Sequence, residues 1–375
     1  MNARLGAAIV AAVLVASAAV GSAIAAEFTY GSWPPASDHL NTTALPRAFK
    51  AIEEATKGAV KWKLVAGGTL ADGKGTFQAV QDNVIQGGLG IAVYVPNLVP
   101  SLNLIYSTII FGDDVVAATG AAMETLMLNC PSCIEEFQKM NAVAMGGFTG
   151  SPYALYCREP IKSVAELKGK RIRGTGGGAE LWRIAGAVPI GATLPEAVSL
   201  LQRGGMDCMW GVWEWLKTFG YGDFAKQVVD YPLGISGPAI GLMLNRTTWK
   251  SLTPEQKRLH LKQAGYVTAE MALGNFVIKN EATFKEVQST KGVVLVKVDG
   301  KDFEELIKSY KAVERERNIE NAKKFGVKDP ASIVDAHEKN LAKWKVLSKQ
   351  IGRDINKFAE TMNREVYDKV DPDKL

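Results

Sequence analysis

The clearest evidence for the fold class is the segment Val60-Lys61-Trp62-Lys63-Leu64-Val65-Ala66-Gly67-Gly68. Polar and apolar side chains alternate before the two glycines, which is the period of a half-buried strand, and the glycines end that strand. Further strands are predicted over residues 28–33 and 89–95, and apolar residues at helical spacing predict helices through 45–52 and 77–84. The order strand, helix, strand, helix, strand predicts a parallel sheet with a cleft at the carboxyl ends of its strands.

The alternation of strands and helices continues in the second half of the chain. Predicted strands cover residues 153–157, 170–173, 187–190, 239–244 and 292–298, and the main predicted helices start near Trp182, Pro195, Pro254 and after Val298. No repeat or low-complexity linker separates the two halves, which favours several crossings of the chain between two lobes. We therefore predict an α/β protein of two lobes, with a ligand cleft between them and long C-terminal helices.

The chain of 375 residues has a length that is typical of two domains. Lobe I is assigned residues 26–150 plus about 237–285, and lobe II residues 151–236 plus about 286–335. Residues from about 336 to 375 are predicted to form a helical segment that packs on the lobes. The excess of 44 Lys and Arg over 39 Asp and Glu is small, and basic residues do not cluster with aromatic ones. Nucleic-acid binding is therefore not predicted.

The N-terminus has the three parts of a secretory signal peptide. Arg4 supplies the positive charge, Leu5 to Val20 is an uninterrupted small and apolar segment, and Ala23-Ile24-Ala25 fits the A-x-A cleavage pattern. A membrane anchor is the alternative, because about 16 apolar residues come close to the minimum for spanning a bilayer. The short flank and the small residues favour cleavage near Ala25. Residues 1–25 are thus predicted to be removed, and the mature chain to reach the periplasm without inserting into the membrane.

The part of the chain predicted to be exported contains four cysteines, Cys130, Cys133, Cys157 and Cys208. An even number in an oxidising compartment favours disulfides. Cys130-Pro131-Ser132-Cys133 has the spacing of a thiol–disulfide oxidoreductase, which is an alternative function, but that activity requires an exposed first cysteine in a thioredoxin-like unit. Structural pairing is favoured, with Cys157 and Cys208 as the candidate long-range bridge, although the sequence leaves all three connectivities open.

The sharpest local signal is Gly169-Lys170-Arg171-Ile172-Arg173, followed by a glycine-rich loop over 174–178 and a helix. An arginine at the carboxyl end of a strand reaches the crevice between lobes, where its planar fork can hold a carboxylate. The glycines and the helix N-terminus would add amide groups for an anion. The alternative is a surface arginine in an ordinary turn. A dinucleotide site is not predicted, because the loop departs from G-x-G-x-x-G at Ala179 and is not the first strand–helix turn of a domain.

An aromatic cluster of Trp210, Trp213 and Trp215 follows soon after this region. Packing in the core is one interpretation, and an apolar wall for the body of a ligand is the other.

Residues suited to catalysis or to metal binding are few. The chain has 3 histidines. His260 and His337 lie in charged helical stretches and are predicted to face solvent, and His39 follows the capping Asp38 at the start of a helix. No H-E-x-x-H or G-x-S-x-G motif and no paired histidine spacing occurs in the sequence. No metal, cofactor or enzymatic activity is therefore predicted.

The order of motifs from Glu159 to Pro232 resembles the extracytoplasmic solute receptors of TRAP (tripartite ATP-independent periplasmic) transporters. The matching segments are Pro160-Ile161, Leu167 to Arg173, Gly186-Ala187-Val188-Pro189, the helix from Glu196 to Gly204 with Asp207, Trp249 to Gln256, Gly68-Thr69-Leu70 and Gly87 to Ile91. The resemblance implies a two-lobed periplasmic binding protein fold. It also implies a receptor that closes on a small organic acid and delivers it to the membrane permease subunits of the transporter. A binding protein of an ABC importer is the remaining alternative in this class.

The resemblance implies that Arg173 holds the carboxylate of the ligand. Gly211 stands where the family usually has Asn, and a second arginine of acidic-sugar receptors falls near Tyr153. Because both changes replace polar contacts, a monocarboxylate with an apolar or aromatic body is expected in place of a C4-dicarboxylate. Trp210 and Trp213 are predicted to form the apolar wall. The weaker candidates for the lining of the site are Tyr94, Tyr153, Trp33 and Gly211.

Overall fold

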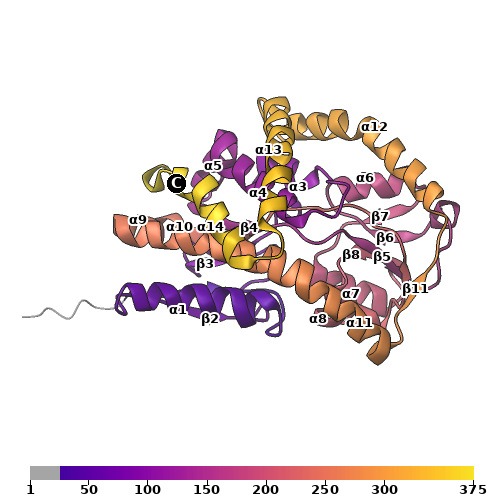
Figure 1. Cartoon of the computed structure of the whole chain (residues 1–375), viewed down its shortest axis with the longest axis horizontal. Helices are drawn as coiled ribbons and strands as arrows, with labels where there is room; N and C mark the ends of the chain where they lie inside the picture. Colours follow the sequence, from indigo (N-terminus) through magenta and orange to yellow (C-terminus); the bar gives the residue numbers. More distant parts are fainter. Residues whose placement is uncertain (1–25) are drawn as a thin grey trace, which may run out of the picture.

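Two separate sheets, each packed against helices, organise the molecule (Figure 1). The computed structural model describes residues 26–375, so the predicted signal peptide lies outside the described residues. The mixture of sheets and helices confirms the predicted α/β class. Within the described residues, no helix combines the length and the apolar composition needed to cross a bilayer.

The first sheet has the strand order β2-β1-β3-β10-β4. Its strands are β1 (Ala26–Gly31), β2 (Val60–Val65), β3 (Gly87–Gly90), β4 (Ala142–Phe148) and β10 (Ala239–Asn245). β1 pairs in parallel with β2 and β3, as the opening strand–helix alternation predicts, and β10 runs antiparallel to β3 and β4. The strand predicted over 89–95 lies earlier, because pairing ends at Gly90 and a short 3-10 helix follows over Ala92–Tyr94.

The second sheet has the strand order β11-β9-β5-β8-β6-β7. Its strands are β5 (Ala154–Cys157), β6 (Arg171–Arg173), β7 (Val188–Ile190), β8 (Cys208–Gly211), β9 (Gln227–Val229) and β11 (Val294–Val296). β6 runs parallel to β7 and β8, so the carboxyl ends of these three strands meet at one edge. One disulfide, Cys157–Cys208, joins β5 to β8 at directly paired residues, and the other, Cys130–Cys133, lies at the start of the helix over 131–139.

Shorter helices connect the strands of each sheet. In the first half these are α1 (Leu45–Ala55), α2 (Thr76–Gln81), α3 (Pro100–Ser107), α4 (Val115–Glu124) and α5 (Pro131–Lys139), and later α6 (Gly177–Ile184), α7 (Leu194–Gln202), α8 (Glu214–Thr218) and α9 (Arg246–Ser251). Thr193 and Glu196 form a reciprocal capping box at the start of α7, because each side chain accepts a hydrogen bond from the other residue's backbone amide. The box holds Leu194 at the edge of the second sheet.

The described chain crosses between the sheets at three places. Residues 149–153 lead from β4 to β5, residues 230–238 lead from β9 to β10, and a long helix leads on to β11. The long helix consists of α10 (Pro254–Ala269), a π-helical segment (Glu270–Lys279) and α11 (Asn280–Lys291), and it runs from one sheet to the other in Figure 1. The helix predicted over 254–274 therefore begins correctly and extends further than expected.

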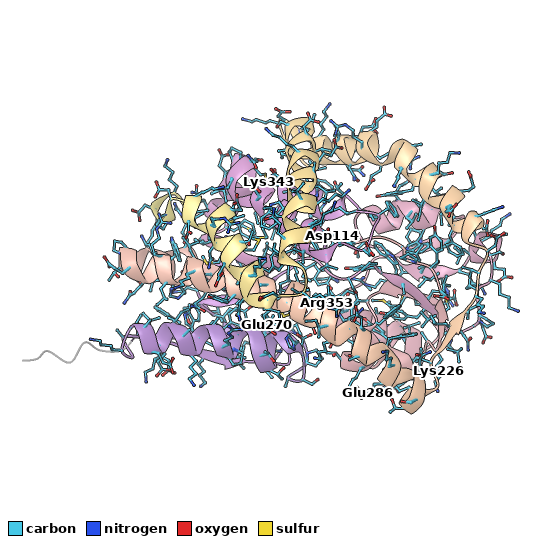
Figure 2. All side chains as sticks on the ribbon, viewed as in Figure 1. Asp114, Lys226, Glu270, Glu286, Lys343 and Arg353 are labelled. Atoms are coloured by element: carbon cyan, nitrogen blue, oxygen red, sulfur yellow. A yellow bond between two sulfur atoms is a disulfide. The ribbon has the colours of Figure 1, made fainter. Side chains whose placement is uncertain are left out.

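Three C-terminal helices, α12 (Gly300–Lys324), α13 (Pro330–Ile351) and α14 (Ile355–Glu365), confirm the predicted long helical end of the chain. α12 contacts both α3 and α6, and so touches helices of both sheets. α13 packs on α4 at Gly120, where a Cβ atom would lie 2.1 Å from the Trp344 ring. Lys343, labelled in Figure 2, and Trp344 donate hydrogen bonds to Glu124 at 2.9 and 2.6 Å.

The prediction that His260 and His337 face solvent is wrong. His260 on α10 is 1% exposed; its Nε2 accepts from Trp62 Nε1 at 3.0 Å, and its Nδ1–H donates to the Gln256 carbonyl oxygen at 2.7 Å. His337 on α13 is also buried, and burial lowers the pKa of both imidazoles to about 4. Each histidine lies on the buried face of its helix, and the charged residues around it in the sequence do not reveal which face that is.

Candidate ligand-binding site

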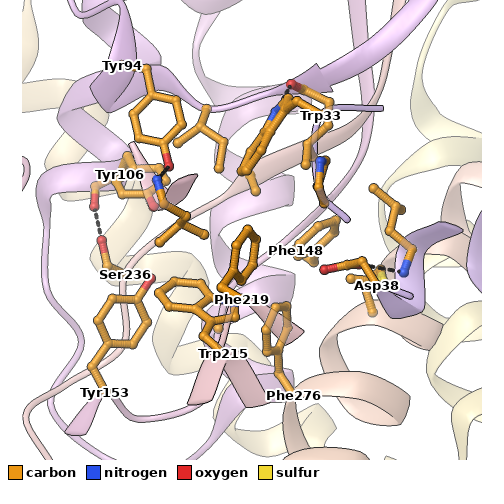
Figure 3. Close-up of a pocket in the computed structure, with 18 of the residues that line it drawn as sticks. Trp33, Asp38, Tyr94, Tyr106, Phe148, Tyr153, Trp215, Phe219, Ser236 and Phe276 are labelled. Atoms are coloured by element: carbon orange, nitrogen blue, oxygen red, sulfur yellow. Dashed lines mark hydrogen bonds between the residues drawn. The ribbon is translucent and has the colours of Figure 1, made fainter. Parts of the chain in front are cut away.

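A cavity lies between the two sheets, at the carboxyl ends of β1, β3 and β6 (Figure 3). Its walls come from both sheets, from both crossing segments and from the long helix. The space open to the centre of a water molecule is about 50 Å³, several times the roughly 10–15 Å³ that a single water needs. The cavity therefore has room for a small ligand that touches both sheets.

Arg173 supplies the positive charge of the cavity. It is the last residue of β6 and is 3% exposed, and its Nε donates to the Ala192 carbonyl oxygen at 2.9 Å. The side chains with the largest electrostatic effect on Arg173 in the described chain are tyrosines, and no carboxylate is among them. A buried guanidinium whose protein partners are neutral attracts an anion, and its planar fork matches a carboxylate.

The cavity tyrosines Tyr94, Tyr106 and Tyr153 lie close enough to Arg173 for its charge to affect their pKa values. Burial raises the pKa of Tyr94 and of Tyr153 to about 12, although the charge of Arg173 opposes this effect. Burial raises the pKa of Tyr106 as well. All three are therefore neutral near pH 7, and they place hydroxyl groups beside the guanidinium.

Trp33 forms the wall on the side of the first sheet. Its ring centre lies 5.9 Å from that of Tyr94 and 6.4 Å from that of Phe219, which belongs to the second-sheet side. The indole N–H donates to the Leu89 carbonyl oxygen at 3.0 Å, so the ring is fixed and its polar atom is satisfied. The wall presents apolar ring surface to a ligand.

Aromatic side chains also close the rest of the cavity. The Trp215 ring lies 5.6 Å from that of Tyr153, and the Phe148 and Phe276 rings lie 5.8 Å apart (Figure 3). A cavity with one buried cation and several rings is suited to a small acid with a flat or apolar body.

Asp38 adds a carboxyl group to the wall next to Phe148 and Phe276. It is 6% exposed, and its Oδ1 accepts from the Leu40 amide at 2.8 Å. Burial and the nearby Glu214 raise the pKa of Asp38 to about 7, and the Leu40 amide opposes them in part. In the described part of the chain, no three or more His, Cys, Asp or Glu side chains come together as a metal site would require.

The sequence pattern of the family described as bacterial extracellular solute-binding protein, family 7, matches residues 32–321. The chain belongs to this family. Its members are binding proteins, and the match confirms the predicted location in the periplasm.

Solved structures of TRAP periplasmic solute-binding proteins share the fold of this family 7 protein. The one from Bordetella bronchiseptica, with bound (R)- and (S)-mandelate, is 22% identical over 85% of this chain and 99% of its own, with a TM-score of 0.71. A marine metagenome protein specific for aromatic acid ligands, in complex with metahydroxyphenylacetate, is 19% identical over 85% and 99%, with a TM-score of 0.75. The protein from Pseudomonas putida F1, with bound D-glucuronate, is 22% identical over 81% and 98%, with a TM-score of 0.66. These similarities confirm the two-lobed fold and the resemblance to TRAP receptors.

Four residues predicted to line the site of this family 7 protein lie in the cavity: Arg173, Tyr94, Tyr153 and Trp33. They are distant in sequence, and the ends of β1, β3, β6 and the first crossing segment bring them together. Their roles in binding remain predictions.

Trp210 and Trp213, the predicted apolar wall, do not line this cavity. Trp210 lies on β8 and packs at 4.6 Å from Tyr153 and 6.1 Å from Trp182, behind the cavity. Trp213 packs at 4.3 Å from Phe284 of α11. The third tryptophan of the cluster, Trp215, reaches the cavity instead, because α8 turns the chain after β8.

Gly211 lies at the end of β8 and also stays outside the lining. A Cβ atom there would lie 2.5 Å from the Trp215 ring and 2.7 Å from the Tyr156 hydroxyl. The glycine therefore makes room for the tryptophan that does line the cavity.

The glycine-rich loop after β6 serves close packing of the protein on itself. A Cβ atom at Gly177 would lie 2.1 Å from the Ser107 carbonyl oxygen, and one at Gly178 would lie 2.1 Å from the Trp210 ring. The expected use of these glycines beside a ligand anion is not seen, since neither lines the cavity.

Several lining residues are absent from the sequence-based candidates: Asp38, Tyr106, Phe148, Phe219 and Phe276. The sequence singles out Trp215 only as a member of the tryptophan cluster. Asp38 lies shortly after the carboxyl end of β1, where site residues are expected. The sequence does not make it a candidate, because a role in capping the following helix already explains an aspartate at this position. Phe276 lies in a helix that is apolar on several faces, and no local pattern separates it from the core.

Proposed function

We propose that this protein is the periplasmic receptor of a TRAP transporter for a small monocarboxylate with an aromatic or apolar body, which it delivers to the membrane permease. The observation that carries the proposal is the buried Arg173, whose neighbours are neutral tyrosines, inside a cavity walled by aromatic rings. The guanidinium holds the carboxylate, the tyrosine hydroxyls add hydrogen bonds, and Trp33, Trp215 and Phe219 enclose the body.

The receptor carries out binding and no chemical step. A ligand that touches both sheets stabilises the closed arrangement by its higher affinity for that state. The division into lobe I (26–150 plus about 237–285) and lobe II (151–236 plus about 286–335) is part of the proposal. The crossing segments over 149–153 and 230–238 are short, which supports their use as hinges.

The alternative of a thiol–disulfide oxidoreductase is not favoured. Cys130 and Cys133 are buried at 1% and 0% exposure, whereas that chemistry requires an accessible thiolate.

Titration calorimetry with benzoate, phenylacetate, mandelate and succinate tests the proposed ligand class. We expect at least one aromatic acid to bind and to raise the melting temperature, since a ligand at 100 times its Kd stabilises the folded state by about 2.7 kcal/mol. Tight binding of succinate together with no binding of any aromatic acid would overturn the proposal.

A further inference from the structure

Asp38 is a second charged group in the cavity. A ligand carboxylate held by Arg173 gives Asp38 no part in binding. It follows β1 of the first sheet, whereas Arg173 ends β6 of the second, so the two enter the cavity from different sheets. The groups with the largest electrostatic effect on Asp38 are Glu214, Lys279 and His39, and Arg173 is not among them. Asp38 therefore faces a different part of a bound ligand.

Only one oxygen of the Asp38 carboxyl group has a hydrogen-bond donor within the described part of the protein. Its Oδ1 accepts from the Leu40 amide. The other oxygen has no hydrogen-bond partner among the described residues, and Figure 3 shows the carboxyl group turned toward the aromatic side chains Phe148 and Phe276. Burying a hydrogen-bond acceptor in such apolar surroundings destabilises the folded state unless a donor binds to it.

Nearby charged groups are occupied by other partners. Glu214 lies 3.5 Å from Lys279, and His39 lies 2.8 Å from Glu270, which Figure 2 labels on the long helix. Asp38 therefore forms no ion pair with another side chain among the described residues. Capping of the Leu40 amide does not explain an acid at this position either, because Asn or Ser caps a helix about as well and carries no charge.

We propose that Asp38 determines specificity: its open carboxyl oxygen accepts a hydrogen bond from a hydroxyl or amino group of the ligand, away from the carboxylate held by Arg173. The cavity then selects monocarboxylates that carry a hydrogen-bond donor. It rejects dicarboxylates, because a second carboxylate would be repelled by the Asp38 carboxylate and by the nearby Glu214. This inference rests on the proposed function, since Arg173 sets the direction in which the ligand lies.

Calorimetry at pH 7.5 with a matched set of acids tests the inference. The set comprises phenylacetate, 3- and 4-hydroxyphenylacetate, 4-(aminomethyl)phenylacetate and 4-carboxyphenylacetate, so that neutral, cationic and anionic substituents are compared. We expect at least one hydroxy or aminomethyl acid to bind wild type at least tenfold more tightly than phenylacetate, and the dicarboxylate to bind at least tenfold more weakly. In Asp38→Asn the preference for the donor-bearing acid should fall below threefold. Asp354→Asn makes the same change at an aspartate that also accepts from a backbone amide, at the N-cap of α14 outside the cavity, and should keep the wild-type preference.

The outcomes separate the inference from the function on which it rests. If phenylacetate binds in a manner that depends on Arg173, but no donor improves binding or the preference survives Asp38→Asn, the role of Asp38 is wrong and the receptor function stands. If no aromatic monocarboxylate binds to wild type, or if Arg173→Gln binds one within a few-fold of the wild-type affinity, the proposed function, which is argued from Arg173, fails and the inference fails with it.

Discussion

At the scale of single residues, two buried charged groups of opposite sign share one cavity. Arg173 has neutral tyrosines around it, and Asp38 has one backbone amide. Neither arrangement is what stability alone favours, because each group loses hydration without gaining an ion pair. Such groups are typical of binding sites, where a ligand completes the interaction.

Replacement of Arg173 is expected to remove binding of the aromatic acids. Arg173→Gln should weaken the affinity for an acid that wild type binds by about 30-fold or more, because loss of one partner of a buried charged pair costs about 2–5 kcal/mol. Arg173→Lys should fall in between, since it keeps the charge and loses the planar fork. Calorimetry measures both.

Arg171→Gln is the matched control on the same strand. Its guanidinium pairs with Asp207 at 2.7 Å and does not line the cavity, so affinity should stay near wild type. An Arg173→Gln protein that binds within a few-fold of wild type would contradict the role of Arg173 as anchor.

Asp38→Asn is expected to change stability in a pH-dependent way. The pKa of Asp38 is about 7 in the folded state and about 3.9 when unfolded. Below about pH 4 both states hold the proton. Between about pH 4 and 7 the unfolded state has lost the proton while the folded state keeps it, so the stability from this residue falls as the pH rises through this window and levels off above about pH 7. The variant should thus be more stable than wild type at pH 8, by a few kcal/mol at most, with a smaller gain at pH 5.

Urea unfolding at the two pH values measures this difference. An equal change at pH 5 and pH 8 would show that titration of Asp38 is not its source.

At the scale of elements, close approach of backbones positions the site. The start of α6 lies directly on Trp210 because residue 178 has no side chain, and this contact supports the turn that follows Arg173. The capping box of α7 similarly holds Leu194, whose amide donates to the Tyr94 hydroxyl at 3.1 Å.

Gly178→Ala is expected to destabilise the protein. A Cβ atom there would lie 2.1 Å from the buried Trp210 ring, and overpacking of this kind costs about 1–3 kcal/mol. The favourable helix propensity of Ala, about 1 kcal/mol, would act in the opposite direction. Gly191→Ala is the control, because no atom lies within 4 Å of a Cβ at that position. Urea unfolding that ranks the two variants alike would contradict the packing role of Gly178.

At the scale of the whole molecule, contacts between the two sheets surround the cavity. Trp33 meets Phe219, Tyr94 meets Leu194, and Lys74 pairs with Glu196 at 2.8 Å at the surface. A ligand that completes this set of contacts favours closure of the cleft.

Lys74→Ala is expected to weaken ligand affinity slightly. A half-exposed ion pair contributes about 0.2–1 kcal/mol, so the loss should be fivefold or less and should shrink as salt screens the charges. Lys217→Ala is a close match, because Lys217 pairs with Glu286 at the same distance and similar exposure but away from the cavity. Equal effects of the two variants on affinity, measured at low and high salt, would contradict a role of Lys74 in closure.

Local patterns in the sequence were enough to predict the α/β order, the parallel start of the first sheet and the place of Arg173 at the end of a strand that reaches the cavity. These features depend on local patterns: alternation in a strand, glycines that end elements, and an arginine at the carboxyl end of a strand. The family resemblance rests on the same kind of ordered local signal and covers most of the chain.

Other features became clear from the folded chain alone: which tryptophan faces the cavity, which cysteines pair, and the burial of His260 and Asp38. Each of these depends on contacts between residues far apart in the sequence, such as Trp62 with His260 or Cys157 with Cys208. The sequence alone does not show which of several tryptophans in a short segment faces a cavity and which packs in the core. The packing of distant elements then places Trp210 behind the cavity and Trp215 in its wall.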